Sequence, residues 1–481
     1  KTEIVRALTG RNTDRLREER ERGISIVLGF APVDLGEGVS AGIVDVPGHE
    51  RFVKNMVSGA AGVDLALIVV AADEGVMPQT VEHFEVLRLL GIDSAVIAVT
   101  KVDLVDGETA GIVESEVSDL LKGTPLASAP MVRTSALTGE GIERLRALLR
   151  DSAASPVAGR GGGYYRLPID RVFTRSGIGT VVTGTAWSGS VRKGDELVVE
   201  PGGLKVRVRD VQSFDRELEE GRVGMRTALA LHGVKPGDLS AGLQVMTPGV
   251  ASASMMMDAV VETSTMEGSG FENRQRVRFH HAARETLARV VLLDSEKIGR
   301  AGAGLVQLRF ERPVVAMGGD RFVLRRYSPM RVIGGGRVLD PEASKSGPFR
   351  SDRIAFLVAL GSEDRARALS ALVDRAGSAG FPADRARRYG LDADVVLSLA
   401  GNDAGGVVEI GARLFSRRVV ESCESRIYGV LEKAAESDPL VWGMDREQLR
   451  SAAGLGAGPL FPYILEKGEA SGGLFFREGK V

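Results

Sequence analysis

An aspartate and a glycine at the end of an apolar run could bind a metal ion and a phosphate. Asp45-Val46-Pro47-Gly48 follows the apolar pair Ile43-Val44. A carboxylate such as Asp45 can hold Mg2+ through a water molecule, and Gly48, which has no Cβ, lets its backbone N–H approach a phosphate oxygen. The alternative is an ordinary junction between a strand and a helix, with the aspartate as a helix cap. This motif alone leaves both interpretations open.

Two later motifs carry groups that can recognise guanine. Thr100-Lys101-Val102-Asp103 follows an apolar run, and Ser135-Ala136 follows another. The Asp103 carboxylate could accept both N–H groups on the Watson–Crick edge of guanine, since an ionised carboxylate is a pure acceptor. Lys101 could lie along the base plane, and the backbone at Ser135-Ala136 could contact guanine O6. The three motifs in this order predict a site for a guanine nucleotide.

The elements between these motifs must place them at one edge of a sheet. Apolar runs and amphipathic stretches alternate, and the expected elements are strands at 42–46, 65–71 and 95–100 and helices from about 50 and over 79–90. Strands that alternate with helices predict a parallel sheet with helices on both faces. Ligands of such sheets bind at the carboxyl ends of the strands, where all three motifs lie.

The rest of the chain changes pattern twice. Residues 152–163 are rich in Ala, Ser and Gly and predict a linker. From 164 to about 339, short alternating runs such as 179–185, 196–199 and 206–211 predict two β-barrels, with a boundary near 248–254. After 341, helical spacing followed by a short hairpin occurs twice, which is typical of tandem winged-helix units. The second hairpin is expected at 473–476.

Composition limits the setting and the partners. With 62 Lys and Arg against 64 Asp and Glu, the chain is close to neutral, so binding to nucleic acid would need a local patch. Residues 271–331 hold thirteen Lys or Arg against six Asp or Glu, together with His280-His281. Such a surface would suit RNA phosphates. The alternative is a set of scattered, solvated charges.

The single cysteine and the apolar runs exclude other classes. Cys423 cannot form a disulfide within the chain, which fits a reducing, cytoplasmic compartment. The longest strongly apolar run, 65–72, is flanked by aspartates and is far shorter than the ~18 residues of a membrane helix. It predicts a buried strand, and we expect no contact with a membrane.

These motifs resemble those of the translational GTPases and, within them, the selenocysteine-specific elongation factors. The stretches that carry the resemblance are 12–16, 22–26 (first switch), 45–50 with 52–56 (second switch), 100–103, 169–173 and 179–185. Thr100 stands where most GTPases have Asn, a substitution shared by the selenocysteine branch. The implied fold is multidomain: an α/β P-loop GTPase domain at 1–155, β-barrels at 164–250 and 254–345, and tandem winged-helix units at 350–418 and 419–481.

The resemblance implies a GTPase that binds GTP or GDP with Mg2+. Lys1 and Thr2 would be the last residues of the phosphate loop, with Lys1 on the β- and γ-phosphates. Thr2, Ser25 and Asp45 would hold Mg2+, and His49 would orient the attacking water. The other nucleotide contacts would come from Gly48, Thr100, Lys101, Asp103, Ser135, Ala136 and Leu137. Hydrolysis would be slow until the ribosome orders the switches.

The resemblance also places an aminoacyl pocket in the second domain. Asp170, Arg171 and Arg226 occupy positions that the family uses around the aminoacyl group. A selenol is largely anionic at neutral pH, so a selective pocket needs fixed cations, and Arg stays charged when partly desolvated. The alternative is a surface ion pair between Asp170 and Arg171, with Arg226 as a charge at a strand edge.

The function implied is GTP-dependent delivery of selenocysteinyl-tRNA to the ribosome at recoded UGA codons, by a cytoplasmic monomer. On this interpretation the chain starts inside the phosphate loop and ends before the units that bind the selenocysteine-insertion mRNA hairpin. The alternatives are another elongation-factor-like GTPase, or a fragment that binds RNA or the ribosome and cannot hydrolyse GTP.

Overall fold

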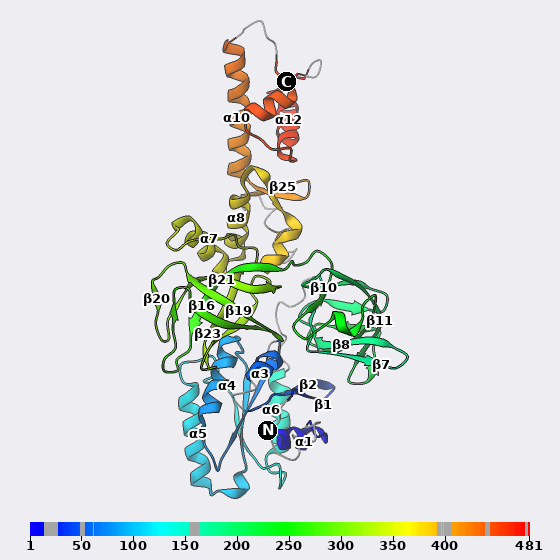
Figure 1. Ribbon diagram of the computed structural model, residues 1–481, viewed down its shortest axis with the longest axis vertical. Coiled ribbons are helices and arrows are strands. Elements are labelled where there is room, and N and C mark those ends of the chain that lie inside the picture. The colour runs from blue at the N-terminus through cyan, green and yellow to red at the C-terminus, as the bar shows by residue number, and fades with distance from the viewer. Residues whose placement is uncertain are drawn as a thin grey trace. The chain divides into compact units, whose positions relative to one another are not determined.

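The computed structural model describes residues 1–13, 27–48, 53–60, 62–153, 163–391, 396, 398, 406–437, 443–476 and 480–481 (Figure 1). They form two compact units, Lys1–Arg350 and Ser351–Val481. In the part of the chain that is described, none of the helices combines the length and the apolar character that crossing a bilayer requires.

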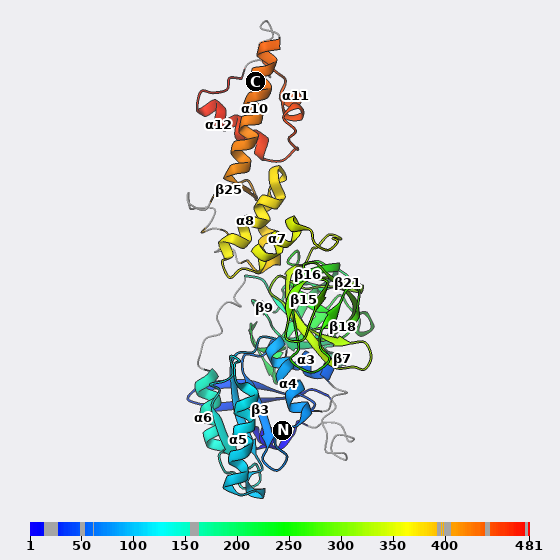
Figure 2. The ribbon, with the colours of Figure 1, turned by 90° about the vertical axis from the view of Figure 1, so that its left-hand side faces the viewer.

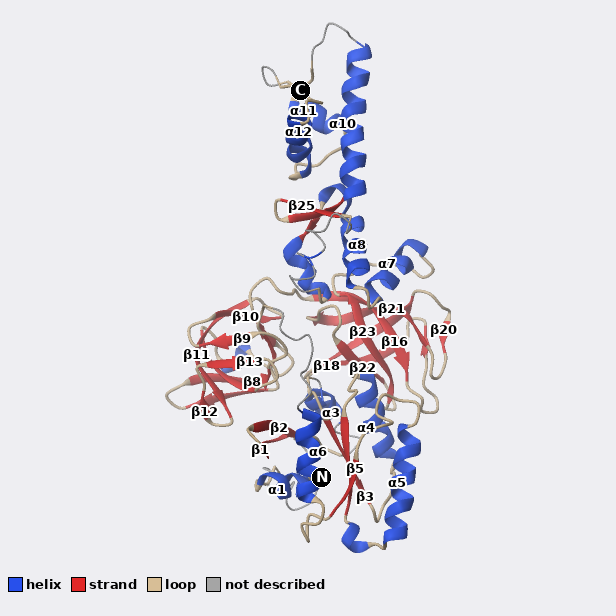
Figure 3. Cartoon of the chain, turned by 180° about the vertical axis from the view of Figure 1, so that it is seen from behind, coloured by secondary structure: helices blue, strands red, loops and turns tan. Residues whose placement is uncertain are grey.

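The first unit begins with an α/β domain. Its parallel sheet has the order β3-β4-β5, with bounds Ala66–Ala71, Ala95–Thr100 and Met131–Thr134. The helices are α1 (Thr2–Thr9), α3 (Val53–Ala60), α4 (Pro78–Leu89), α5 (Gly107–Leu121) and α6 (Ile142–Ala153), with a 3-10 turn at Val102–Leu104. Figures 1 and 3 show α5 and α6 on opposite sides of the sheet. The predicted α/β architecture is confirmed.

The two faces of this sheet have separate cores. Phe84 of α4 and Val113 and Val117 of α5 are buried against one face. Ile4 of α1 and Leu145 of α6 are buried against the other. All six residues of β4 are buried, as expected for the central strand of a sheet covered on both faces.

The strand expected at 42–46 does not join the parallel sheet. It is part of β2 (Val39–Asp45), which pairs antiparallel with β1 (Gly29–Gly36). The two residues between these strands, Glu37 and Gly38, have φ of 55° and 78°. Two consecutive positive φ angles favour a tight hairpin, because their twist matches that of the flanking strands. The expectation of a parallel strand here was therefore wrong.

Two barrels follow, as predicted. The first has the strand order β6-β15-β10-β11-β14-β8-β7, and the second closes in the order β16-β21-β19-β18-β22-β23. The bounds in the first are β6 Arg166–Pro168, β7 Arg171–Arg175, β8 Gly179–Thr185, β9 Ser190–Arg192, β10 Glu196–Glu200, β11 Leu204–Ser213, β12 Arg216–Glu217, β13 Glu220–Arg222, β14 Arg226–His232 and β15 Gln244–Met246. Those in the second are β16 Ser254–Thr263, β17 Phe271–Glu272, β18 Arg276–His281, β19 Arg284–Leu292, β20 Lys297–Ile298, β21 Ala303–Val314, β22 Arg321–Arg326 and β23 Val332–Asp340.

A buried charge network joins the two barrels. The Arg166 guanidinium donates to both carboxylate oxygens of Asp320, at 2.8 and 2.6 Å, and its Nε donates to Gln244. His281 Nε2 lies 2.9 Å from Asp320 Oδ2, and Trp187 contacts both Arg166 and the His281 ring. Burial alone would raise the pKa of Asp320, but the Arg166 charge and the hydrogen bonds from His281 and Arg166 hold it well below its usual range.

The α/β domain packs directly on the second barrel. Apolar residues of α3, α4 and two barrel strands share one core, which contains Met56, Val57, Val86, Leu89, Leu90, Val323 and Val332. Beside it the buried Glu85 carboxylate accepts from Thr265 Oγ1 at 2.6 Å and from Arg88 at 3.1 Å. Because α3 follows the Asp45 motif in the chain, this core fixes one side of the candidate site.

The second unit contains helices and one small sheet. The elements are α7 Ser351–Gly361, α8 Arg365–Ala376, β24 Phe381–Pro382, a 3-10 helix at Ala383–Tyr389, β25 Val407–Ile410, β26 Arg413–Ser416, α10 Arg417–Ser437, α11 Arg446–Ala452 and α12 Leu460–Ala470. A further 3-10 turn covers Gly377–Ala379. The sheet order is β24-β26-β25, and Figure 2 shows α11 and α12 beside α10.

In the first winged-helix unit the elements up to Gly390 and the hairpin from Val407 follow the winged-helix order, and most of the helix expected before residue 400 lies outside the described residues; the described residues of the second winged-helix unit show no hairpin at 473–476. The helix expected after Pro382 is a 3-10 helix that ends at Gly390 in the left-handed region. Residues 474–476 form no strand, so the expected hairpin at 473–476 was wrong. Asp445 instead makes an isolated bridge with Lys480, and Met444 exchanges backbone hydrogen bonds with Val481. The Asp445 side chain also caps α11, which competes with regular strand pairing at this position.

Candidate functional site

The carboxyl ends of the three parallel strands lie side by side. Ala71, Thr100 and Thr134, the last residues of β3, β4 and β5, are direct neighbours in the register. Ala71 is followed by the polar segment Ala72-Asp73-Glu74-Gly75, Thr100 begins the Thr100 motif, and Thr134 precedes Ser135-Ala136. The fold therefore collects these segments along one edge, where ligands of parallel sheets bind.

Asp45 ends β2, and two hydroxyl groups converge on it. The residue is 4% exposed. Oδ2 accepts from Thr2 Oγ1 at 3.1 Å and from Thr13 Oγ1 at 2.6 Å. Among the described residues no group of three or more His, Cys, Asp and Glu side chains could hold a metal ion. One carboxylate with hydroxyl oxygens is a hard donor set that suits Mg2+, whose remaining ligands are usually waters and phosphate oxygens.

Lys1 lies beside the same group of residues. Its ammonium Nζ is 3.1 Å from His83 Nδ1 of α4 and 3.7 Å from the position that a Cβ on Gly48 would take. Burial of the ammonium group lowers the pKa of Lys1, and Asp45 opposes this by favouring the charged form. Burial and then the positive charge of Lys1 lower the pKa of His83 to about 3. His83 is therefore neutral at pH 7, and its Nδ1 accepts a hydrogen bond from the Lys1 ammonium.

Two of the predicted residues lie outside the described part of the chain. Ser25 was expected to bind Mg2+ and His49 to orient the attacking water. Both assignments stay predictions.

The Thr100 motif holds an exposed carboxylate beside a paired lysine. Lys101 has a φ of 60°, and its Nζ donates to Asp73 at 2.9 Å and to Glu74 at 3.0 Å. The hydrogen bond with Asp73, and after it the one with Glu74, raises the pKa of Lys101. Asp103 is exposed in the following 3-10 turn, so its carboxylate is accessible to a ligand.

The segment after β5 is a tight loop built around Ser135. Ser135 Oγ accepts from the backbone N–H of Leu137 and of Thr138, and its carbonyl accepts from Gly139 N–H at 2.9 Å. Gly141 has a φ of 70°, and a Cβ there would lie 1.9 Å from the Arg133 carbonyl oxygen. The loop leaves Ala136 half-buried and Leu137 85% exposed.

Four side chains in this region were not assigned a role from the sequence. Thr13 and His83 lie at the phosphate end, and Asp73 and Glu74 hold Lys101. The polar ending of β3 was a visible signal for Asp73 and Glu74, since each strand of the sheet ends in such a segment. Nothing local distinguishes Thr13 or His83, because their partners are 32 and 82 residues away in the chain.

In the first barrel, Asp170 pairs with Arg226. The two guanidinium Nη atoms donate to the two carboxylate oxygens at 2.6 and 2.9 Å, and Thr183 Oγ1 bridges both side chains. The side chains are 13% exposed for Arg226 and 12% for Asp170. The alternative of a surface ion pair between Asp170 and Arg171 is therefore wrong. The partner of Asp170 is Arg226, and the pair is largely buried.

Both arginines face the α/β domain. The Arg226 guanidinium lies 3.2 Å and that of Arg171 5.0 Å from the centre of the Phe30 ring of β1. Arg171 also donates to the Leu28 carbonyl. Phe30 pairs with Val44 in the β1–β2 hairpin, next to Asp45. The β1–β2 hairpin thus contacts the aminoacyl-pocket arginines through Phe30 and carries Asp45 of the nucleotide site.

Family models match three consecutive parts of the chain. The model described as "Elongation factor Tu GTP binding domain" matches residues 1–155. "Elongation factor Tu domain 2" matches 179–245, and "Selenocysteine-specific elongation factor, beta-barrel domain" matches 258–345.

Whole-chain comparisons find several selenocysteine-specific elongation factors among the similar proteins. The selenocysteine-specific elongation factor of Desulfomicrobium baculatum is 38% identical over 479 residues, which cover 98% of this chain and 75% of that protein. The factor of the same name from Escherichia coli K12 is 33% identical over 460 residues, covering 94% and 71%. A crystal structure of bacterial selenocysteine-specific elongation factor EF-Sec superposes with a TM-score of 0.81 at 28% identity, covering 98% of this chain and 76% of that one. The elongation factor SelB of Methanococcus maripaludis in complex with the GTP analogue GPPNHP has a TM-score of 0.63 at 26% identity, covering 73% and 77%.

Proposed function

Because this chain belongs to the selenocysteine-specific elongation factors, and is thus a GTP-dependent translation factor, we propose that it carries selenocysteinyl-tRNA to the ribosome at recoded UGA codons. The observation that supports this substrate best is the enclosed Asp170–Arg226 pair beside Arg171. Two fixed guanidinium groups suit a selenolate, which carries a charge that serine lacks. We further propose that the protein acts in the cytoplasm as a monomer and works together with the selenocysteine-insertion mRNA hairpin.

The nucleotide would bind along the carboxyl edge of the sheet. In this proposal Thr100, Lys101, Asp103 and the 135–137 loop contact the guanine, and Lys1 and Gly48 contact the phosphates. Asp103 accepts from the Watson–Crick edge, and its exposure supports this role. When the nucleotide binds, Lys101 would give up part of its hydrogen bonding with Asp73 and Glu74, and its side chain would lie along the plane of the guanine base.

Thr2, Ser25 and Asp45 would hold Mg2+, which when bound neutralises charge that develops on the phosphate oxygens. Thr13 holds Asp45 in place, and neutral His83 holds the Lys1 ammonium. His49 would orient the attacking water. α3, which follows the Asp45 motif in the chain, is packed against the second barrel.

The basic strands of the second barrel are proposed to contact the tRNA acceptor and T stem. The guanidinium groups of Arg276 and Arg278 lie 4.9 and 5.3 Å from the centre of the exposed Tyr327 ring. These two arginines also pair with Glu311 and Glu285, so part of the positive charge in this region is already compensated. The local excess over residues 271–331 still supports a surface for RNA phosphates.

Replacing Asp103 tests the guanine assignment. We expect Asp103→Asn to weaken GTP binding by about 10- to 100-fold, because charge-assisted hydrogen bonds contribute about 1.5–3 kcal/mol. Xanthine has an oxygen at position 2, to which the amide can donate, so binding of xanthosine triphosphate should improve. The measurement is competition between the two nucleotides on the complete gene product. Asp119→Asn, an exposed residue of α5, should leave the preference unchanged.

Replacing Arg226 tests the aminoacyl pocket. We expect Arg226→Ala to lower affinity for selenocysteinyl-tRNA by about 10- to 100-fold, because a charge-assisted contact with the selenolate is lost. Affinity for seryl-tRNA should fall much less. The measurement is binding of both tRNAs in the presence of GTP, with Arg226→Lys as a variant that keeps the charge. Equal losses for the two tRNAs would contradict the pocket.

A further inference from the structure

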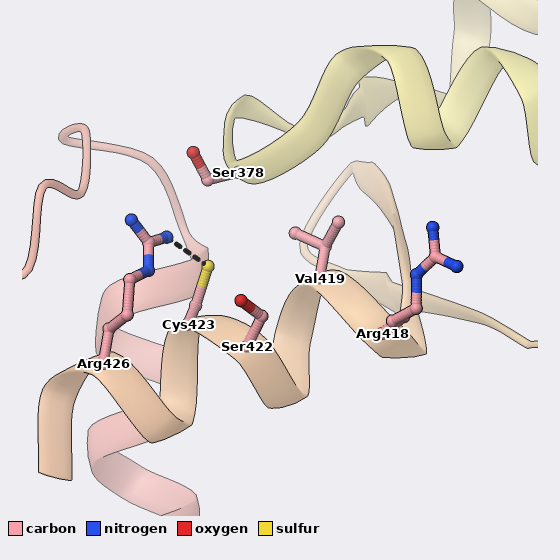
Figure 4. Close-up of a pocket in the computed structure, with 6 residues that line it drawn as sticks. All are labelled: Ser378, Arg418, Val419, Ser422, Cys423 and Arg426. Carbon is pink, nitrogen blue, oxygen red and sulfur yellow. Dashed lines mark hydrogen bonds between the residues drawn. The ribbon is translucent and has the colours of Figure 1, made fainter. Parts of the chain in front are cut away.

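The second unit contains a pocket of about 310 Å³ between α10 and the turn at Gly377–Ala379. Figure 4 shows its lining: Ser378 from the turn, and Arg418, Val419, Ser422, Cys423 and Arg426 from α10. The floor contains Val419 and buried Cys423, and the rim is polar. None of these residues takes part in the nucleotide or aminoacyl sites.

The rim of the pocket is positively charged. Arg418 and Arg426 are exposed, and no lining residue is acidic. Arg426 Nη2 donates to Cys423 Sγ at 2.9 Å, which fixes its guanidinium over the floor. Within the described residues, no carboxylate forms an ion pair with either arginine. Two acidic residues of α10 lie between these arginines in the sequence: Glu424 is paired with Lys467, and Glu421 is exposed.

The polar groups follow one face of the helix. Arg418, Ser422 and Arg426 are spaced four residues apart, so they lie above one another on α10. At ~1.5 Å per residue the two arginines are about 12 Å apart along the axis. The two arginines are thus spaced along the helix in a way that a chain of phosphates can match. Arg is suited to phosphate because its planar fork donates two parallel hydrogen bonds.

We propose that this face of α10, with Arg418, Ser422 and Arg426, binds the phosphodiester backbone of RNA. The proposal goes beyond delivery of the aminoacyl group. It rests on the chain acting among RNA molecules as a translation factor, and it is independent of the Arg226 pocket. Contacts to phosphates fix orientation without reading sequence, so the face would position the second unit on RNA.

The test is binding of a short fluorescent RNA duplex of arbitrary sequence to the complete gene product over about 50 to 200 mM salt. We expect the double variant Arg418→Gln/Arg426→Gln to bind about tenfold more weakly at low salt. The slope of log K against log salt should fall by about 1 to 2, because each lost phosphate contact lowers it by about 0.9. Arg418→Lys/Arg426→Lys, which keeps both charges, should retain the slope. Arg367→Gln, an exposed arginine of α8, is the matched control and should change neither quantity.

Cys423 gives a local readout, because it is the only cysteine and lines the pocket; since it is buried, its alkylation requires local opening of this face, which bound RNA should oppose. RNA should slow its alkylation in the unmodified protein and not in the Arg418→Gln/Arg426→Gln variant. An unchanged salt slope in that variant would overturn the proposal. So would protection of Cys423 by inorganic phosphate alone to the same extent as by RNA, since that result indicates a small-anion site. Loss of tRNA discrimination in Arg226→Ala is measured separately, so failure of either proposal can be recognised.

Discussion

Asp320→Asn is expected to lower the free energy of unfolding of the two barrels by about 3–5 kcal/mol. The substitution leaves the Arg166 guanidinium, whose side chain is 4% exposed, without its counter-charge. Removing one partner of a buried ion pair costs this much because the other charge stays buried and unpaired. The measurement is the denaturant midpoint followed by fluorescence of Trp187, which contacts Arg166 and His281, in a Trp442→Phe background.

A surface pair of the same barrel provides the control. Glu311 and Arg276 are 43% and 39% exposed, so Glu311→Gln should cost less than about 1 kcal/mol. The double variant Arg166→Met/Asp320→Asn should recover part of the loss, because no charge is left unpaired. Equal, small losses for Asp320→Asn and Glu311→Gln would show that the network does not hold the barrels together.

The same pair predicts a pH dependence. The pKa of Asp320 is held below its usual range in the folded protein, so folding favours the ionised form. Its contribution is complete above the unfolded pKa of about 3.9 and is lost as the pH falls towards the folded pKa. The difference in stability between the unmodified protein and Asp320→Asn should therefore be constant near neutral pH and shrink in acid below about pH 4.

Asp45→Asn is expected to reduce GTP hydrolysis on the ribosome by about 10- to 100-fold, the usual effect of losing a group that holds a bound metal in place. The amide carries no charge for Mg2+. The hydroxyls of Thr2 and Thr13 both donate to Oδ2, and the amide oxygen can still accept from them, so the main loss is the charge. The measurement is kcat/KM for GTP on the complete gene product as a function of Mg2+, and high Mg2+ should restore part of the activity.

Asp106→Ala separates this effect from a general loss of stability. Asp106 is an exposed cap of α5 that accepts from Thr109 N–H at 2.8 Å. Losing a cap costs about 1 kcal/mol of stability and should not change the Mg2+ dependence. Hydrolysis by Asp45→Asn at the unmodified rate, with the same Mg2+ requirement, would exclude Asp45 from the metal site.

The sequence predicted the local elements and the chemistry that follows them along the chain. Strands at 65–71 and 95–100 and the helix over 79–90 could be identified because burial on one or both faces imposes a local apolar period. The Asp45 and Thr100 motifs could be interpreted because their residues are neighbours in sequence. The basic stretch 271–331 was visible for the same reason, although its pairing with Glu285 and Glu311 was not.

Tertiary structure alone decided which distant side chains meet. Asp170 could pair with its neighbour Arg171 or with Arg226, 56 residues away, and only the register of the barrel strands selects Arg226. Thr13 on Asp45, His83 beside Lys1 and Arg166 on Asp320 likewise depend on contacts between separate elements. A sequence specifies which groups each element carries, because periodicity is local. The partner of a buried charge is set by how the elements pack, because it is the packing that removes water and leaves one geometry in which each polar group is satisfied.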